Sequence, residues 1–191
     1  MAKITMLTIV PKQLAVDLNS EHRIQDYNTL PQLNQKVLDT IRQFFSDKVG
    51  YSNLPMACLM QPKDKNGKLM IQTDFSNYLP TNNQDSVLFL LEMPDDLIVS
   101  TNYGSLLEVS EMMTEFADDP SMLEFYQDEL MQQLQVGIDY DDHDLISFIP
   151  FLDYSRCKFF AAFDSNFEPD ESLKMPGLSK LDLRELQLFM N

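Results

Sequence analysis

Lysine and arginine are missing from nearly half of this sequence. Residues 69–155 contain neither, although 18 aspartates and glutamates occur in these 87 positions, and His143 is the one side chain there that could become cationic. Ion pairs with lysine or arginine are therefore excluded among side chains of this stretch, which presents an unbalanced negative field. We expect it to repel nucleic acid and anionic membranes and to attract a basic protein surface.

Glycine, cysteine and long apolar runs are also scarce. The five glycines form neither a Gly-x-Gly-x-x-Gly pattern nor a P-loop, so a phosphate-cradling loop of either type is excluded. Cys58 and Cys157 lie in apolar segments, which is typical of buried, reduced thiols. No run approaches the ~20 apolar residues that span a bilayer, and the apolar stretch before Pro11 is too short for a signal peptide. These absences predict a cytoplasmic protein without a membrane partner.

The composition that remains is sufficient for a folded core. A hydrophobic content of 44%, with 13 phenylalanines and 12 methionines among 191 residues, fits one domain. Apolar and β-branched segments predict strands at residues 3–10, 54–61, 68–73, 87–93, 97–100, 145–151 and 157–163. Periodicity and capping signals predict helical structure at residues 12–18, about 31–49, from 105, about 120–135 and 180–190, with a loop over 19–29.

These elements do not alternate strictly, which is typical of an α+β fold. We expect a mixed or antiparallel sheet of about six strands packed with about four helices. The expected organisation is a single domain, 1–191, with a strongly acidic half from about residue 69 to 155. In the helix at 31–49, the spacing of Leu38, Ile41 and Phe45 predicts that all three face the core. Ser105 and Glu108 have the spacing of a capping box, so the next helix is expected to begin at Ser105.

The most organised polar feature is a row of carboxylates on that second helix. Spacings of 3, 4 and 3 predict that Glu108, Glu111, Glu115 and Asp118 share one face. Like charges so placed cost roughly 0.2–0.5 kcal/mol per pair, which fits a binding role, although a solvated helix face is the alternative. The opposite, core-facing side is expected to hold Val109, Met112, Met113 and Phe116. The predicted partner-binding residues are Glu108, Glu111, Glu115, Asp118, Glu124, Asp128, Asp141 and Asp142.

The acidic loop at residues 139–144 does not match a known metal motif. Counted from Asp139, the sixth and twelfth positions of an EF-hand loop hold Asp144 and Pro150 instead of Gly and Glu. His143 and Cys157 could pair as base and nucleophile, but the glycines of a nucleophile elbow do not accompany them. The sequence therefore predicts no catalytic residue, no metal ligand and no cofactor.

Four blocks in the first hundred residues occur in a recognisable order. They are a strand at 6–9, an amphipathic helix, a strand at 54–59, and a strand and turn at 91–100. In this order they resemble an uncharacterised bacterial family of unknown function. The resemblance covers about half of the chain and implies no activity and no site residues.

The leading hypothesis is a non-enzymatic acidic interaction protein. It would bind a basic surface of a nucleic-acid-binding protein or nuclease by mimicking nucleic acid, as phage- and plasmid-encoded anti-restriction and anti-CRISPR inhibitors do. The alternatives are a small intracellular enzyme of unknown reaction, with site residues scattered along the sequence, and a protein that is acidic without any recognition role. An enzyme should show a pocket where polar groups converge, whereas a mimic should show an elongated carboxylate surface.

Overall fold

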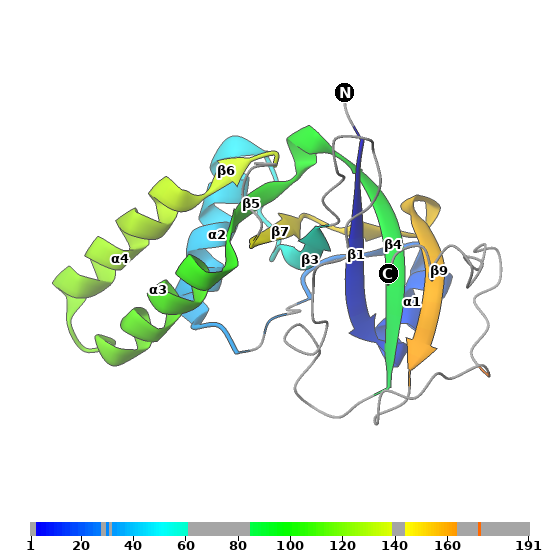
Figure 1. The fold of residues 1–191 in the computed structure, drawn as a ribbon, viewed down its shortest axis with the longest axis horizontal. Coiled ribbons are helices and arrows are strands. Elements are labelled where there is room, and N and C mark those ends of the chain that lie inside the picture. The colour runs from blue at the N-terminus through cyan, green and yellow to red at the C-terminus, as the bar shows by residue number, and fades with distance from the viewer. Residues whose placement is uncertain are drawn as a thin grey trace. The chain divides into compact units, whose positions relative to one another are not determined.

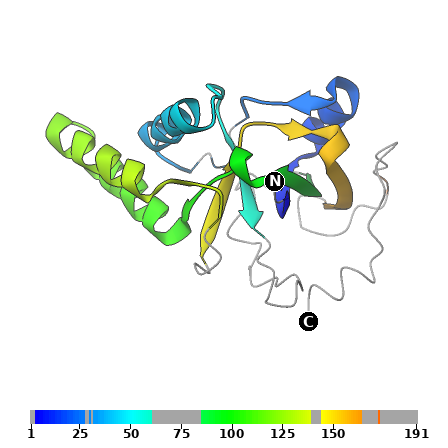
Figure 2. The same cartoon turned by 90° about the horizontal axis from the view of Figure 1, so that it is seen from above.

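The computed structural model describes residues 3–27, 30, 32–60, 85–138, 144–163 and 172, and the chain divides into two compact units (Figures 1 and 2). The described residues form four α-helices and nine strands, which confirms the α+β class. The strands outnumber the predicted six largely because three of them have only two residues. Five strand pairings are antiparallel: residues 3–11 with 56–60, 23–24 with 152–153, 86–94 with 157–163, and 99–102 with both 135–136 and 145–149. The predicted single domain over 1–191 stays a prediction.

The first unit combines three helices with strands of a seven-stranded sheet. Strand β5 (Val99–Asn102) lies between β6 (Gln135–Val136) and β7 (Leu145–Ile149). All five residues of β7 are buried, as are the first three of β5. A 3₁₀ turn, η2 (Asp95–Leu97), precedes β5, and the helices are α2 (Gln35–Lys48), α3 (Tyr103–Glu115) and α4 (Pro120–Gln133). The three helices contact one another, and α3 and α4 lie side by side in both views (Figures 1 and 2).

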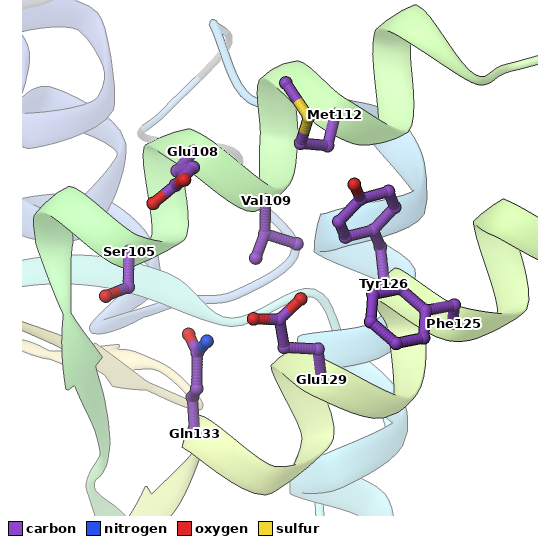
Figure 3. A pocket seen from close by; sticks show the side chains of 8 residues that line it. All are labelled: Ser105, Glu108, Val109, Met112, Phe125, Tyr126, Glu129 and Gln133. Carbon is purple, nitrogen blue, oxygen red and sulfur yellow. The ribbon is translucent and has the colours of Figure 1, made fainter.

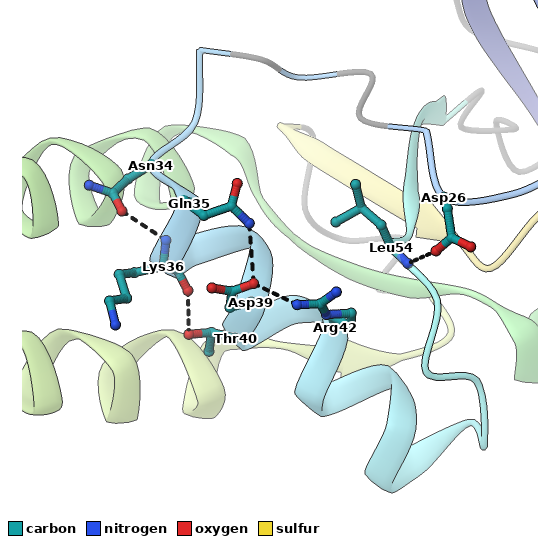
Figure 4. Close-up of polar contacts among 8 residues, drawn as sticks. All are labelled: Asp26, Asn34, Gln35, Lys36, Asp39, Thr40, Arg42 and Leu54. Atoms are coloured by element: carbon teal, nitrogen blue, oxygen red, sulfur yellow. Dashed lines mark hydrogen bonds and ion pairs between the residues drawn. The ribbon is translucent and has the colours of Figure 1, made fainter.

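Helix α2 begins four residues later than predicted because Asn34 caps it. The Asn34 side chain accepts a hydrogen bond from the backbone N–H of Lys36 at 2.8 Å (Figure 4). Leu38, Ile41 and Phe45 are at most 3% exposed, so the predicted core face is confirmed. Gly50 adopts a φ of +86° just beyond the helix, and its N–H donates to the carbonyl of Phe45 at 2.9 Å. This left-handed glycine ends the helix as expected.

The predicted start of α3 at Ser105 is wrong. The helix begins at Tyr103, and the Asn102 side chain accepts a hydrogen bond from the backbone N–H of Ser105 at 3.0 Å. The backbone N–H of Tyr103 also donates to the carbonyl of Asp144 at 2.7 Å. Because β5 runs directly into the helix, the capping residue is the last residue of the strand, and Ser105 already lies in the first turn.

The second unit contains further strands of the same seven-stranded sheet. In it β1 (Lys3–Pro11) lies between β3 (Met56–Met60) and β4 (Ser86–Pro94), and β9 (Cys157–Phe163) pairs with β4. The chain passes between the two units within β3. Helix α1 (Lys12–Glu21) follows β1 directly and ends at His22, which has a φ of +62°. The predicted loop over 19–29 is therefore wrong at its start, because residues 19–21 continue the helix and β2 (Arg23–Ile24) follows.

An ion pair joins β2 to β8 (Leu152–Asp153), which leads into η3 (Tyr154–Arg156). Arg23 donates to a carboxylate oxygen of Asp153 at 3.1 Å, and the backbone N–H and the hydroxyl of Ser155 both donate to the other oxygen. Partial burial by itself raises the pKa of the Asp153 carboxyl. The hydrogen bonds from Ser155 and Arg23 outweigh it, so that this pKa lies below its ordinary value.

Cys157 is buried, as its apolar setting predicts. The Cys58 side chain lies outside the described residues, as do the predicted strand at 68–73 and the predicted helix at 180–190. Within the part of the chain that is described, no helix is long and apolar enough to cross a membrane.

Replacing Phe45 with alanine should destabilise the protein by about 3–5 kcal/mol, because this side chain is fully buried in α2 and leaves a cavity. Denaturant unfolding measures the difference. Ser46→Ala, at an exposed position of the same helix, should change the unfolding free energy by less than about 0.5 kcal/mol. Equal unfolding midpoints for the two variants would contradict the core assignment.

Replacing Asp153 with asparagine should destabilise the protein at neutral pH but not at strongly acidic pH. Because the pKa of Asp153 is lowered in the folded state, its ionised form stabilises the fold above the unfolded-state pKa. That contribution is lost as the pH falls through the folded-state pKa. Unfolding of wild type and variant across this range should show converging stabilities. Asp96→Asn, at an exposed carboxylate in η2, is the control, and a difference for Asp153 that is constant with pH would refute the assignment.

Candidate partner-binding site

Helices α3 and α4 are joined by a short turn that local sequence defines well. Helix α3 closes with the N–H of Phe116 donating to the carbonyl of Met112 at 2.9 Å, and the N–H of Asp119 donates to the carbonyl of Phe116 at the same distance. The Asp119 side chain then caps α4 by accepting from Ser121 and Met122, at 3.0 and 3.2 Å. Pro120 occupies the first helical position, where its missing N–H costs nothing.

Helices α3 and α4 form a helical hairpin, and the capping residue of α2 is hydrogen-bonded to its first helix. The backbone N–H of Asn34 donates to the Ser110 hydroxyl at 2.8 Å, and its side-chain amide donates to the Thr114 hydroxyl at 2.9 Å. The same Asn34 side chain caps α2 through its oxygen. One residue therefore sets both the start of α2 and its position against α3.

Aromatic side chains form the contact between α3 and α4 near the turn that joins them. The rings of Phe116 and Tyr126 stack with centroids 6.1 Å apart, and Phe125 meets Tyr126 edge-on at 5.2 Å. Phe125 is nevertheless 57% exposed. Leu130 is the one residue of α4 that is buried. Much of α4, including a large aromatic ring, is thus available to a partner.

A groove of about 370 Å³ lies between the two helices (Figure 3). Helix α3 contributes Ser105, Glu108, Val109 and Met112. Helix α4 contributes Phe125, Tyr126, Glu129 and Gln133. In Figure 3 the Glu129 and Gln133 side chains extend from α4 toward α3, and the Tyr126 hydroxyl points toward Met112. The groove is therefore lined by both polar and apolar side chains, with a carboxylate on each helix.

Further carboxylates are exposed on the same two helices. Glu108, Glu111 and Glu115 are exposed on α3, and Glu124 and Asp128 are exposed on α4. Adjacent helix residues differ by about 100°, so Asp128 points away from the groove when Glu129 lines it, and Glu124 lies one turn from Asp128. We call Glu108, Glu111, Glu115, Glu124, Asp128 and Glu129 the acidic rim.

The predicted row of four carboxylates on one helix is wrong in its last member. Asp118 is exposed, but α3 ends at Glu115 and Asp118 lies in the turn before α4. The predicted core face is confirmed for Val109 and Met113, which are buried, whereas Met112 and Phe116 are half-buried. Both lie on the side of α3 that meets α4: Met112 lines the groove, and Phe116 stacks on Tyr126.

The remaining predicted residues cannot be placed. Asp141 and Asp142 lie outside the described residues, as do Asp139 and His143. Elsewhere, no group of three or more His, Cys, Asp or Glu side chains that could hold a metal ion occurs in the described ranges. Whether the loop at 139–144 contributes to partner binding stays a prediction.

Sequence patterns did not identify the groove itself. The adjacent aromatic residues Phe125 and Tyr126, on a helix of otherwise mostly polar residues, were the available signal. The amide oxygen of Gln133 is inaccessible to solvent and has no hydrogen-bond partner among the residues described. Nothing in the sequence indicates such an unsatisfied acceptor, because it results from the packing of α4 beside α3.

Comparison with family models, with curated proteins and with solved structures found no match for this chain. The resemblance of its first hundred residues to an uncharacterised bacterial family stays a prediction. The geometry and charge of the hairpin are therefore the observations from which a function can be proposed.

Replacing Asn102 with alanine should destabilise the protein by about 0.5–2 kcal/mol, because α3 loses its N-terminal cap. Ser105→Ala is the matched control, since Ser105 lies inside the first turn and does not cap the helix. Thermal or denaturant unfolding measures both variants. A larger loss for Ser105→Ala than for Asn102→Ala would indicate that the helix begins at Ser105 after all.

Proposed function

We propose that this protein is a non-enzymatic interaction protein that binds a basic protein surface through the α3–α4 hairpin. The observation that carries the proposal is the acidic rim: six carboxylates on two adjacent helices, in a stretch from residue 69 to 155 that contains no lysine or arginine. Five of its members are exposed, and neither α3 nor α4 carries a lysine or arginine. An approaching basic partner therefore meets a surface on which negative charge predominates.

In its more specific form, the proposal makes the partner a nucleic-acid-binding protein. The three glutamates of α3 span about 10 Å at ~1.5 Å per residue, whereas one DNA strand carries a charge every ~3.4 Å. Their density is lower than that of DNA, but α4 adds a second line of charge. Such a surface would compete with nucleic acid for a basic groove, which is the action of an anti-restriction or anti-CRISPR inhibitor.

The enzyme alternative receives less support from the described residues. The titratable side chains that line the groove are Glu108, Tyr126 and Glu129, without a histidine or a cysteine among them. Cys157 belongs to the second unit, and His143 lies outside the described residues. We therefore assign the hairpin to binding.

Reversing Glu108, Glu111 and Glu115 to lysine should abolish most partner binding, because it replaces three negative charges of the rim with three positive ones. The test is capture from a nuclease-treated extract of the native host, with quantitative mass spectrometry of the retained proteins. Wild type should retain basic nucleic-acid-binding proteins, which duplex DNA should release and which should be lost as salt rises. The triple variant should retain at least about tenfold less.

The matched control reverses three exposed carboxylates outside the hairpin: Glu21, Asp47 and Asp96. It changes the net charge by the same amount, so it should bind as wild type does if position matters. Equal loss in both triple variants would show that only total charge counts. Unchanged binding in the rim variant would show that the acidic rim is merely a solvated surface.

A further inference from the structure

Apolar side chains occupy the centre of the acidic rim. Met112, which is half-buried, lines the groove from α3, and Phe125 lines it from α4 with 57% of its surface exposed; Val109 also lines the groove but is only 3% exposed. A partner that made only electrostatic contacts would use none of this apolar surface. Exposed aromatic and methionine side chains are typical of the centres of protein interfaces. The groove therefore points to a partner that brings an apolar side chain together with its positive charges.

We propose that the groove binds an amphipathic basic helix, with an apolar stripe against Met112 and Phe125 and with lysine or arginine on both flanks. This inference rests on the proposed function and specifies its partner. At about 370 Å³, the groove lies near the lower end of the ~300–1,000 Å³ range of ligand pockets. It accommodates a few side chains of one helix, a mode of recognition in which anchors recur at every third or fourth residue.

The charges are arranged to match such a helix. Glu108 lines the groove on α3 and Glu129 lines it on α4, and Glu111 and Glu115 are exposed on the same helix as Glu108. A helix lying along the furrow between α3 and α4 would thus have carboxylates on both sides of its apolar stripe.

A second copy of the same chain is a poor occupant of this groove. The protein has a net charge of −16, and neither α3 nor α4 contains a lysine or arginine. Two hairpins facing each other would place carboxylate rims in contact, and like-charge contacts of this kind oppose association. The charge complementarity therefore favours a basic segment of a different protein.

Two synthetic peptides of identical composition test the inference. Both have 18 residues of leucine, lysine, arginine and alanine; in one the leucines recur at i, i+3, i+4 and i+7, and in the other they are scattered around the helix. Fluorescence anisotropy at 0.15 M salt, with the full-length protein, measures their affinities. The patterned peptide should bind at least about tenfold more tightly than the scattered one, because only its leucines can reach the groove together.

Phe125→Ala should weaken binding of the patterned peptide about tenfold, as expected for an aromatic anchor, and should leave the weak binding of the scattered peptide unchanged. Val16→Ala, at an apolar α1 residue that is 45% exposed, is the control and should change neither. Circular dichroism checks that each variant folds; if Phe125→Ala does not, Phe125→Leu, which shortens the anchor, should still reduce the preference.

Equal affinity for the two peptides would overturn the inference but leave the proposed function intact, since charge alone would then explain binding. Absence of patterned-peptide binding up to about 1 mM would overturn it as well. A preference that persists in Phe125→Ala, or self-association of the protein that Phe125→Ala abolishes, would assign the groove to another occupant. Failure of the proposed function itself is read separately, from the charge-reversal variants in the capture experiment.

Discussion

Repulsion between carboxylates is the constraint around which the α3–α4 hairpin is built. Neither helix contains a cation that could pair with them, and like charges one turn apart each cost roughly 0.2–0.5 kcal/mol. The hairpin must be held by other means. These are the helix caps of Asn102 and Asp119, the stacked rings of Phe116 and Tyr126, and the two hydrogen bonds that Asn34 donates to α3.

Those contacts are concentrated on one side of the hairpin, which leaves the other side to the acidic rim. Leu106, Val109 and Met113 are buried on α3, whereas Leu130 alone is buried on α4. Helix α4 packs against both α2 and α3 but buries only one residue completely, and its exposed aromatic ring lies beside charges instead of inside the core. Both the groove and the rim follow from this lopsided packing, because a fully buried α4 would leave no room for either.

The sequence correctly predicted those features of the fold that depend on a single local pattern, such as the apolar periodicity of one helix. Leu38, Ile41 and Phe45 are buried because the apolar period of α2 admits only one inward face. The start of α3 was missed because its cap, Asn102, is also the last residue of β5, and strand propensity concealed it. Asp118 was misplaced because its spacing from Glu115 continues the helical period, although the chain has already turned toward α4. The groove could not be predicted, because it exists only once two helices lie side by side.

Screening by salt would have opposite effects on the folding of the free hairpin and on the stability of the proposed complex. Repulsion among Glu108, Glu111 and Glu115 opposes folding of the hairpin, so added salt relieves a cost that the folded chain carries. Attraction between these residues and a basic partner favours association, so added salt weakens the complex. A partner that neutralises the acidic rim would therefore supply the positive charges that residues 69–155 lack. A cation within either helix would stabilise the free hairpin but would reduce the charge presented to a partner, so the absence of any such cation is what the proposed binding requires.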